Sequence, residues 1–477
     1  MAEASDRRLA VEARDGAELT LPALGDPAGV VLDRLRQAGH EASVVGGSLR
    51  DVLLGHAPED WDIATSATPE AVVRLFAHTT WLNRFGTVTV HGRDGRAQVT
   101  TYRAEGGYSD RRRPDEVRFG VSLADDLARR DFTINAIAWV PTDLAARRGR
   151  VVDPHGGLGD LRAGVLRAVG DPDERLGEDA LRLLRAVRFA HRLRLTLDAA
   201  TEAAIRRRSE LAAGVSGERT RDELMRILTA DADAAANAGQ PSAPPPSEAF
   251  RLMEDLGLLG VILPELAALR GVPQAKAIPG DALDHTLLAV DAADPSPAEL
   301  RLAALLHDLG KAETLADGHF FGHEVVGADL AGRVMDRLRF PRATRDAVVH
   351  AVRHHMFAYT PDWTDAAVRR FVKRVGGDRL PLLLALRRAD NAASGALEPA
   401  TGGIDELVAR IGAAGTEPTE IRHLALDGDD LQRALGLAPG PVIGRLLDEL
   451  MEAVLDDPSL NERDRLLALA RTRLGRR

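Results

Sequence analysis

VVGGSLRDVLLGHAPEDWD, residues 44–62, is the stretch that decides the fold. Its apolar start ends at Gly46-Gly47, and Ser48 then begins one or two helical turns. Gly55 follows them at the position where a left-handed closing residue is usual. Glycine lets the backbone approach a phosphate, and the free N–H groups at the start of a helix point at it. The stretch therefore predicts an anion site between a strand and a helix.

Two carboxylates follow this turn at a spacing that suits a metal site. Asp60 and Asp62 flank Trp61, and in an extended strand such positions lie on one face, about 6–7 Å apart. Carboxylates so placed can share Mg²⁺ ions, and the glycine turn can hold the phosphates that those ions bridge. Each part alone is common, but the full spacing predicts a metal-dependent site for nucleotidyl transfer.

Composition sets the limits within which this site must be interpreted. The chain has 477 residues, enough for about three domains, and its hydrophobic and charged fractions of 45% and 28% are those of a globular protein. It has no cysteine, no apolar run that could span a membrane and no secretory signal at its polar start. We therefore expect a cytoplasmic protein without disulfides. The net charge of −10 alone would argue against a nucleic-acid partner, unless basic residues cluster locally.

The next 80 residues carry signals of a mixed sheet. Residues 85–90 and 96–103 alternate like two strands of a hairpin, and Thr68 caps a predicted helix whose first position is a proline. The basic segment YSDRRRPDEV, residues 108–117, is typical of a mobile loop. Further on, Asp131 is either a third carboxylate near the metals or a structural cap, and we favour the cap. Arg130 is the better ligand, because an arginine beside the metals can neutralise triphosphate charge.

An Asp/Arg pair in the following helical region suggests how a base could be selected. Asp179 accepts hydrogen bonds and Arg182 donates them, which matches the donor and acceptor groups of cytosine and adenine but not those of uracil and guanine. A wrong base would leave buried polar groups unpaired, so discrimination can be strong. The alternative is an ordinary surface ion pair with little effect on stability.

Taken together, the motifs resemble those of the bacterial CCA-adding tRNA nucleotidyltransferases, of the class shared with bacterial poly(A) polymerases. The resemblance covers roughly residues 42 to 400. Its five motifs, in chain order, are GGSLRD with EDWDIAT, RRDFTINAIA, DPHGGLGD, EDALRLLRAVRFA and GERTRDELMRIL.

This resemblance implies a role for particular residues. Asp60 and Asp62 would hold Mg²⁺, and Gly47, Arg50 and Arg130 would contact the triphosphate. Asp179 and Arg182 would select the base, and Arg185 and Arg188 would complete the nucleotide pocket. It further implies that CTP and ATP are the substrates, that the tRNA 3′ end is the acceptor, and that residues 108–117 form the flexible loop of enzymes that add all three nucleotides.

A second group of chemistry-bearing residues lies in the C-terminal half. His285, His307, Asp308 and Asp390 occur in the order that resembles the HD superfamily of metal-dependent phosphohydrolases. Imidazoles and carboxylates from separate helices can hold one or two divalent metals, here Mn, Ni or Mg. Five more histidines crowd the region, namely His319, His323, His350, His354 and His355.

We therefore expect an α+β protein: a small mixed-sheet nucleotidyltransferase head, an all-α neck, an HD-type helical body and C-terminal helices. The predicted parts are a disordered tail (1–28), the head (29–155), the neck (156–230), an Ala/Pro-rich linker (231–247), the body (248–400) and a C-terminal tail domain (401–477). Three other functions stay open: a poly(A) polymerase, an HD phosphohydrolase with an RNA-binding head, and a tRNA-binding chaperone. The sequence predicts no membrane partner and no particular oligomeric state.

Overall fold

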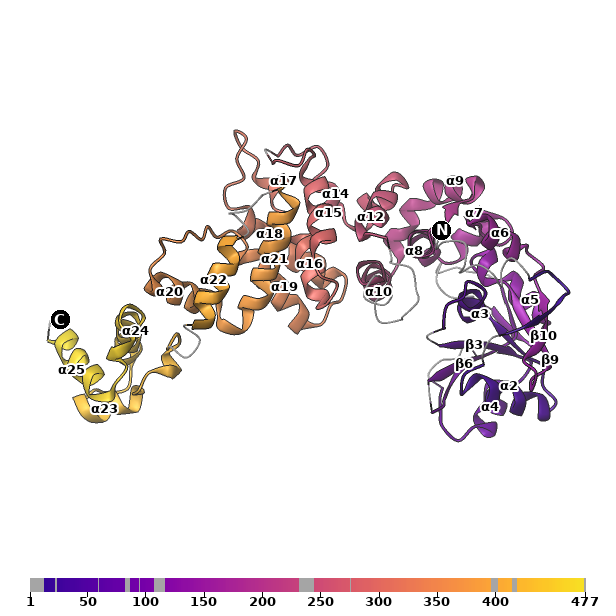
Figure 1. The fold of residues 1–477 in the computed structure, drawn as a ribbon, viewed down its shortest axis with the longest axis horizontal. Helices are drawn as coiled ribbons and strands as arrows, with labels where there is room; N and C mark the ends of the chain where they lie inside the picture. The colour runs from indigo at the N-terminus through magenta and orange to yellow at the C-terminus, as the bar shows by residue number, and fades with distance from the viewer. Residues whose placement is uncertain are drawn as a thin grey trace. The chain divides into compact units, whose positions relative to one another are not determined.

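The structure is a computed structural model in which the chain forms two compact units, Met1–Ala267 and Ala268–Arg477 (Figure 1). It describes residues 13–21, 24–58, 60–81, 86–93, 95–106, 116–230, 244–274, 276–395, 402–413 and 418–475. Most of the basic segment 108–117 lies outside these residues, as does most of the predicted linker. The strands that flank this segment, β7 (Arg103–Gly106) and β8 (Glu116–Phe119), pair antiparallel.

The first unit is built on a mixed sheet. Among the described residues, its strands follow the order β1-β10-β9-β2-β3-β6-β5-β4, and every neighbouring pair is antiparallel except β3 with β6. They are β1 (Glu18–Thr20), β2 (Ala42–Val45), β3 (Trp61–Thr65), β4 (Thr79–Thr80), β5 (Thr87–His91), β6 (Arg96–Thr101), β9 (Ala138–Asp143) and β10 (Arg148–Val152).

Alternation along the strands decides which side chains face the site. Burial alternates along β6: Ala97, Val99 and Thr101 are buried, whereas Gln98 and Thr100 are partly exposed. The parallel register sets Asp62 of β3 opposite Gln98 of β6. Because side chains alternate across a sheet, Asp62, Gln98 and Thr100 share the face that is not packed in the core.

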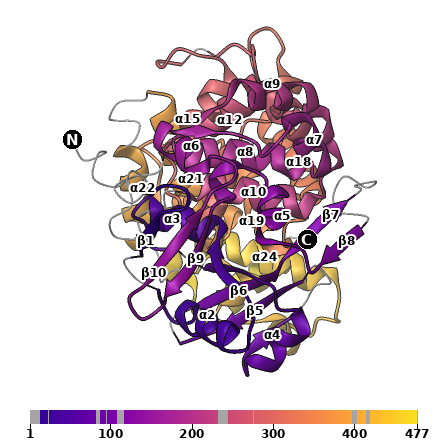
Figure 2. The same cartoon turned by 90° about the vertical axis from the view of Figure 1, so that its right-hand side faces the viewer.

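Helices cover this sheet and continue into a helical neck. Those labelled α6 to α9 gather at one end of the unit, away from α2 and α4 (Figures 1 and 2). The helices are α2 (Ala28–Gln37), α3 (Gly46–Leu53), α4 (Pro69–Leu75), α5 (Leu123–Ala128), α6 (Gly157–Ala163), α7 (Pro172–Glu178), α8 (Leu181–Arg192), α9 (Ala199–Arg208), α10 (Gly217–Leu228), α12 (Pro246–Asp255), α13 (Leu259–Ile262) and α14 (Pro264–Ala267). The predicted α+β head is confirmed. The neck, predicted to be all-α, is helical except for a short parallel ladder of β11 (Val165–Leu166) and β12 (Thr196–Leu197).

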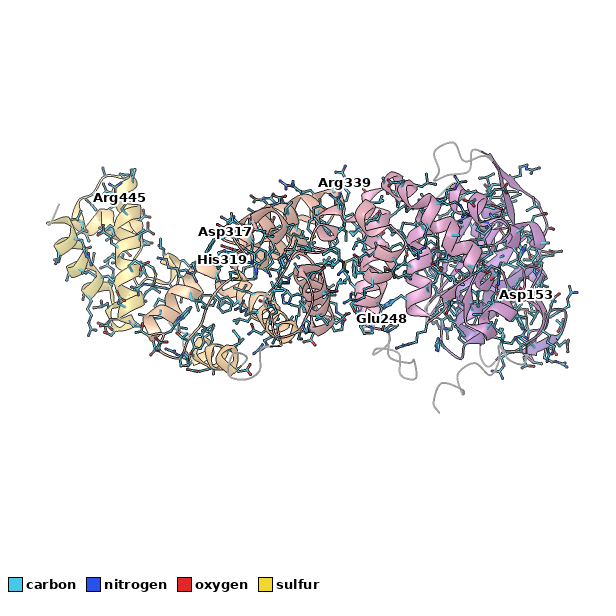
Figure 3. The ribbon with its side chains drawn as sticks, turned by 90° about the horizontal axis from the view of Figure 1, so that it is seen from above. Asp153, Glu248, Asp317, His319, Arg339 and Arg445 are labelled. Carbon is cyan, nitrogen blue, oxygen red and sulfur yellow. The ribbon has the colours of Figure 1, made fainter. Side chains whose placement is uncertain are left out.

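The crossing from sheet to neck is held by Asp153, which is labelled in Figure 3. Its carboxylate accepts hydrogen bonds from the N–H groups of Gly157 (2.7 Å) and Leu158 (2.9 Å) at the start of α6. A Cβ atom on Gly157 would lie 2.1 Å from the carbonyl oxygen of Thr133, so only glycine permits this approach. The motif DPHGGLGD therefore has a clear structural purpose.

Two predicted boundaries differ from the structure. The expected tail 1–28 is not wholly disordered, because Glu18–Thr20 forms edge strand β1 on β10 and Leu21 is fully buried. The expected body does not begin at residue 248, because α12 packs on α8 and α10 within the first unit. Phe250 and Met253 of α12 are fully buried, so a segment that we assigned to the body instead completes the core of the neck.

The second unit is helical. The helices α15, α16, α18, α19 and α21 pack on one another, and a separate apolar core holds α23, α24 and α25 together. In chain order, the helices are α15 (Ala282–Ala292), α16 (Ala298–Leu306), α17 (Lys311–Thr314), α18 (His323–Arg337), α19 (Arg342–His354), α20 (Asp365–Val375), α21 (Leu380–Ala393), α22 (Gly402–Ala413), α23 (Gly428–Leu435), α24 (Pro441–Asp456) and α25 (Arg463–Leu474). Within the described ranges, no helix combines the length and the apolar character needed to cross a bilayer.

Candidate functional site

The glycine turn and Asp62 form one hydrogen-bonded corner. Asp62 Oδ2 accepts hydrogen bonds from the N–H groups of Gly47 (3.0 Å) and Ser48 (3.4 Å), at the amino end of α3. A Cβ atom on Gly46, whose φ is +68°, would lie 2.9 Å from both Asp62 Oδ2 and an Arg130 nitrogen. The close approach that we predicted for a phosphate is therefore made here by a carboxylate. Burial raises the pKa of Asp62, against the opposing effect of Arg130.

Asp60 lies immediately before β3, on the same cavity. Its Oδ1 accepts a hydrogen bond from Arg96 Nε at 2.7 Å, and its Oδ2 lies 3.4 Å from Gln98 Nε2. The Arg96 side chain is half exposed, so solvent screens this ion pair. The carboxylate oxygens of Asp60 and Asp62 thus line the same cavity, and oxygen is the ligand atom that Mg²⁺ prefers.

Every residue that we predicted for the head and neck site lines a single cavity of about 810 Å³. Arg50 and Arg130 are held through Asn135: Arg50 Nη1 donates to its side-chain oxygen at 2.8 Å and Arg130 Nη1 to its carbonyl at 3.2 Å. Arg130 also pairs with buried Asp126 at 3.2 Å. The two guanidinium groups are therefore fixed beside the carboxylates.

Asp131 lines the same cavity, and its oxygens are held by neighbouring groups. Its Oδ1 accepts hydrogen bonds from Phe132 N–H (2.8 Å) and Asn135 Nδ2 (3.1 Å), and its Oδ2 pairs with Arg185 Nη2 at 2.6 Å. Burial alone would raise the pKa of Asp131, but Arg185 and Asn135 hold it well below its usual value. The carboxylate stays charged and fastens α8 to the head.

The pairing of Asp179 differs from the one that the sequence suggested. Asp179 is the residue directly after α7. Its two carboxylate oxygens accept hydrogen bonds from Arg219 of α10, at 2.6 and 3.0 Å. Arg182 instead donates to Glu178 Oε2, to the Arg175 carbonyl (2.7 Å) and to the Arg129 carbonyl (3.1 Å). Asp179 and Arg182 still line the cavity that holds Asp60 and Asp62, but each is fixed by another partner.

Sequence reasoning missed Arg219, Glu223 and Phe189. Arg188 Nε donates to Glu223 Oε2, and both side chains are about 4–5% exposed. Burial lowers the pKa of Arg188 to about 10 despite this partner. The Phe189 ring lies within 5.2 Å of the guanidinium carbons of Arg50, Arg185 and Arg188. Arg219 and Glu223 occur four residues apart in the fifth motif, which was the available signal.

Replacing Glu223 by alanine is expected to lower the free energy of unfolding by about 3–5 kcal/mol, because it leaves Arg188 charged and unpaired inside the neck. Glu202→Ala is the matched control, since its pair with Arg206 is exposed and contributes about 0.5 kcal/mol or less. Chemical denaturation of both variants measures the difference. Equal destabilisation would contradict the assignment of the Arg188–Glu223 pair as the link between α8 and α10.

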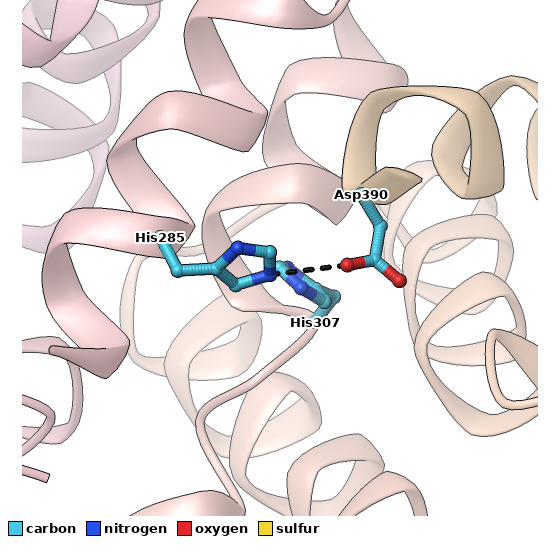
Figure 4. A group of neighbouring side chains, drawn as sticks. All are labelled: His285, His307 and Asp390. Atoms are coloured by element: carbon cyan, nitrogen blue, oxygen red, sulfur yellow. Dashed lines mark ion pairs between the residues drawn. The ribbon is translucent and has the colours of Figure 1, made fainter. Parts of the chain in front are cut away.

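The HD residues also come together, within the second unit. His285 of α15, His307 and Asp308 after α16, and Asp390 of α21 are all buried. Figure 4 shows His285, His307 and Asp390 converging, with His285 Nε2 at 3.0 Å from Asp390 Oδ1. Asp308 Oδ2 lies 3.1 Å from His307 Nε2 and 3.5 Å from His285 Nε2.

Two of the five crowding histidines extend this cluster. His323 and His355 face the other oxygen of Asp308, at 3.5 and 3.8 Å. The other three lie outside the cluster. The His319 ring stacks on Phe321, and the rings of His350 and His354 contact each other. Asp308 therefore joins two groups with metal-ligand geometry, namely His285 with His307 and Asp390, and Asp308 with His323 and His355.

The orientation of the imidazoles fits a metal ion. His307, His323 and His355 each contact a backbone carbonyl through Nδ1 at 2.7–2.8 Å. A carbonyl oxygen only accepts, so Nδ1 carries the proton in each of these rings and Nε2 is the nitrogen that faces the cluster. Burial lowers the pKa of His355 to about 3, which keeps it neutral. Imidazole nitrogens that face a carboxylate at these distances suit a cation between them.

Comparison with known proteins defines the class. Residues 42–167 match the family model described as "Poly A polymerase head domain", and residues 282–394 match "HD domain". A third model, "Probable RNA and SrmB- binding site of polymerase A", matches residues 194–236. The chain thus contains one region that matches a poly(A) polymerase head domain and one that matches an HD domain.

Within this class, the similarity is to CCA-adding enzymes, as the five motifs indicated. The chain is 46% identical over 213 residues to the CCA-adding enzyme of Levilactobacillus brevis and 48% identical over 198 residues to that of Lactobacillus helveticus. These matches cover 44% and 41% of this chain, and it spans about half the length of each relative (52% and 48%). The crystal structure of the Bacillus stearothermophilus CCA-adding enzyme in complex with CTP is 28% identical, with a TM-score of 0.69 over 95% of this chain and 98% of that one.

Proposed function

We propose that this protein is a CCA-adding tRNA nucleotidyltransferase, which adds CMP, CMP and AMP from CTP and ATP to the tRNA 3′ end without a nucleic-acid template. One observation carries the proposal: the carboxylates of Asp60 and Asp62 line the same cavity as Asp179 and Arg182. Two carboxylates that can hold a metal and two side chains that can contact a base therefore face one space. The similarity to CCA-adding enzymes over the head and neck supports the same function.

The reaction needs a divalent metal, which we propose to be Mg²⁺ held by Asp60 and Asp62. Such ions stabilise the charge that develops on the transferred phosphate. Arg50 and Arg130 would bind the triphosphate, since their guanidinium groups are fixed beside the carboxylates. Gly47 would let the phosphates approach the backbone. In the neck, Asp179 and Arg182 would select the base, and Arg185 and Arg188 would shape the pocket around it.

These roles give the proposed parts of the first unit. Residues 29–155 would form the catalytic head and residues 156–230 the nucleotide-selecting neck. The helix α12 would stiffen the neck from behind, because His191 Nε2 of α8 lies 3.0 Å from the carbonyl oxygen of Pro245, immediately before α12.

Incubating the protein with tRNA that lacks CCA, together with ATP and CTP, tests the proposal. A CCA-adding enzyme incorporates two CMP and one AMP and then stops. A poly(A) polymerase would add a long A tail and ignore CTP. A tRNA-binding chaperone, or an HD phosphohydrolase whose head only binds RNA, would incorporate nothing. Acceptors that end in C or CC would show whether the protein performs each step.

We also propose a metal-dependent phosphohydrolase activity for the HD domain. The specific support is the buried cluster in which Nε2 of His285 lies 3.0 Å from Asp390 and Nε2 of His307 lies 3.1 Å from Asp308. His285, His307, Asp308 and Asp390 would hold a divalent ion, either Mn, Ni or Mg, and His323 and His355 would bind on the other side of Asp308. A bound ion of this kind activates water for hydrolysis.

His307→Gln is expected to leave CMP and AMP incorporation within about twofold of the parent protein, because the head has its own metal site. Since even second-shell changes cost 10–100-fold in metal affinity, loss of this ligand should weaken Mn²⁺ binding at the HD cluster at least about tenfold. Calorimetric titration with Mn²⁺ measures the loss. His350→Gln is the control, because His350 lies outside the cluster. Unchanged Mn²⁺ binding in His307→Gln would refute the HD site.

A further inference from the structure

Lysine is rare in this chain, and two of its three lysines contact Asp308 or Asp390, the carboxylates of the cluster that also holds His285 and His307 (the HD cluster). The three are Lys276, Lys311 and Lys373, whereas nearly all other basic residues are arginine. Lys311 Nζ lies 2.5 Å from Asp308 Oδ2, and Lys276 Nζ lies 3.4 Å from Asp390 Oδ1. Each carboxylate that we propose as a metal ligand therefore has an ammonium group beside it.

The two lysines differ in how firmly they are held. Lys311 is 7% exposed, and its Nζ also donates to Gln274 Oε1 at 2.7 Å and lies 5.5 Å from the centre of the Phe320 ring. Lys276 is 27% exposed, and its shortest contact is with Ser394 Oγ at 2.7 Å. Lys311 is thus a fixed part of the interior, whereas Lys276 reaches the cluster from its solvent-accessible side.

Lys276 contacts an oxygen that a bound metal ion would also use. Asp390 Oδ1 lies 3.0 Å from His285 Nε2. Together with His307, these two residues form a group with metal-ligand geometry. A divalent ion bound by these three residues would take this oxygen and would repel an ammonium group a few ångströms away. Ser394 and solvent remain as partners for Lys276, so it can leave Asp390 without being buried unpaired.

The charges around the cluster then favour an anion. Three positively charged side chains contact the carboxylates of Asp308 and Asp390, namely Lys276, Lys311 and Arg387. Arg387 Nη1 lies 3.0 Å from Asp390 Oδ2. These three cations face the two carboxylates and Glu324, whose Oε2 lies 3.8 Å from His323 Nδ1, and a divalent ion would add two positive charges. A phosphate group is the anion that a compact, three-donor ammonium group suits.

We propose that Lys276 is the phosphate-binding residue of the HD cluster. It neutralises Asp390 while the cluster is without metal, and it binds the phosphate group of a phosphoester once a divalent ion has taken Asp390. This inference rests on the proposed HD metal site. Lys276 lies at the rim of that site and is not part of the H…HD…D pattern.

The test uses the full chain with Asp62→Asn as background, which removes one of the two proposed ligands of the head, and it counts as HD binding only the Mn²⁺ binding that depends on His307. Calorimetry gives the Mn²⁺ affinity, and the ³¹P relaxation caused by bound Mn²⁺ gives the affinity for inorganic phosphate. In Lys276→Met, Mn²⁺ is expected to bind about tenfold more tightly, because the competing charge is gone. Phosphate should bind about tenfold more weakly. Lys276→Arg should keep most of the phosphate affinity.

Lys373→Met is the matched control, because Lys373 pairs with Glu452 on the surface of the same unit and should change neither affinity. Thermal unfolding of each variant confirms that it is folded. An unchanged phosphate affinity in Lys276→Met would overturn the proposal, whether or not Mn²⁺ binds more tightly. If the background protein shows no Mn²⁺ binding that depends on His307, the proposed HD metal site itself fails.

Discussion

Asp62→Asn is expected to lower CMP and AMP incorporation by at least about 1,000-fold, the largest effect that we expect from any single substitution. The change removes one of the two carboxylate charges proposed to hold the metal, and metals of this kind contribute several kcal/mol to stabilising the transition state. Each 1.36 kcal/mol corresponds to tenfold in rate. Single-turnover incorporation of CMP into tRNA that lacks CCA measures the loss.

The same substitution should not destabilise the protein. The pKa of Asp62 is raised in the folded state, mainly by burial, so the charged carboxylate lowers stability at neutral pH relative to a neutral side chain. Asparagine keeps the shape and one acceptor oxygen for the N–H groups of Gly47 and Ser48. The midpoint of thermal unfolding is therefore expected to stay the same or rise.

Opposite effects on activity and stability are typical of a functional residue. Asp143→Asn provides the control, because Asp143 is a partly exposed residue on β9 of the same sheet whose carboxylate contacts Arg148 and the Ala146 N–H. It should leave incorporation unchanged. Full incorporation by Asp62→Asn would show that the metal is held elsewhere.

Much of the head was predictable because its determinants are local. The order of apolar segment, Gly46-Gly47 and helix is a contiguous pattern, and φ values of +68° at Gly46 and +86° at Gly55 are what glycine permits. Thr68 caps α4 through a hydrogen bond to Ala71 N–H, as its position before Pro69 indicates. The burial alternation in β6 likewise follows from its sequence. Short-range patterns of this kind determine local structure without knowledge of the rest of the chain.

The partners of the site residues could not be predicted, because they come from distant segments. Arg219 lies 40 residues from Asp179, and no local pattern distinguishes it from Arg221 two residues later. His355 and His323 joined the metal cluster while His354 and His319 did not, since the packing of α18 and α19 decides which side chains turn inward. Strand β1 was missed for the same reason, because its partner β10 lies about 130 residues away along the chain.

Asp179→Asn is expected to change which nucleotides are incorporated rather than to stop the reaction. An amide can donate as well as accept, so the group that rejects uracil is lost. A site built to hydrogen-bond its substrate can reject a mismatched analogue by about 10⁴-fold. We therefore expect the preference for CTP over UTP, expressed as a ratio of kcat/KM, to fall by about 100-fold or more. Competition between labelled CTP and UTP measures it.

The structure adds Arg219 to this prediction. Its bidentate contact holds both oxygens of Asp179, so Arg219→Met should leave the carboxylate oriented only by the Leu181 N–H, which donates to Oδ1 at 3.1 Å. Selectivity should then fall in the same direction as in Asp179→Asn, by a smaller factor of about tenfold. Arg221→Met is the control, because Arg221 lies on the same helix and pairs with the adjacent Asp222.

The double variant shows whether the two residues act as one unit. If Arg219 acts by orienting Asp179, adding Arg219→Met to Asp179→Asn should cost little further selectivity, since the group that it orients is already gone. If the losses multiply instead, Arg219 contacts the nucleotide by itself. If neither single variant alters selectivity, Asp179 does not face the base, and the neck of this protein must select CTP and ATP by other residues.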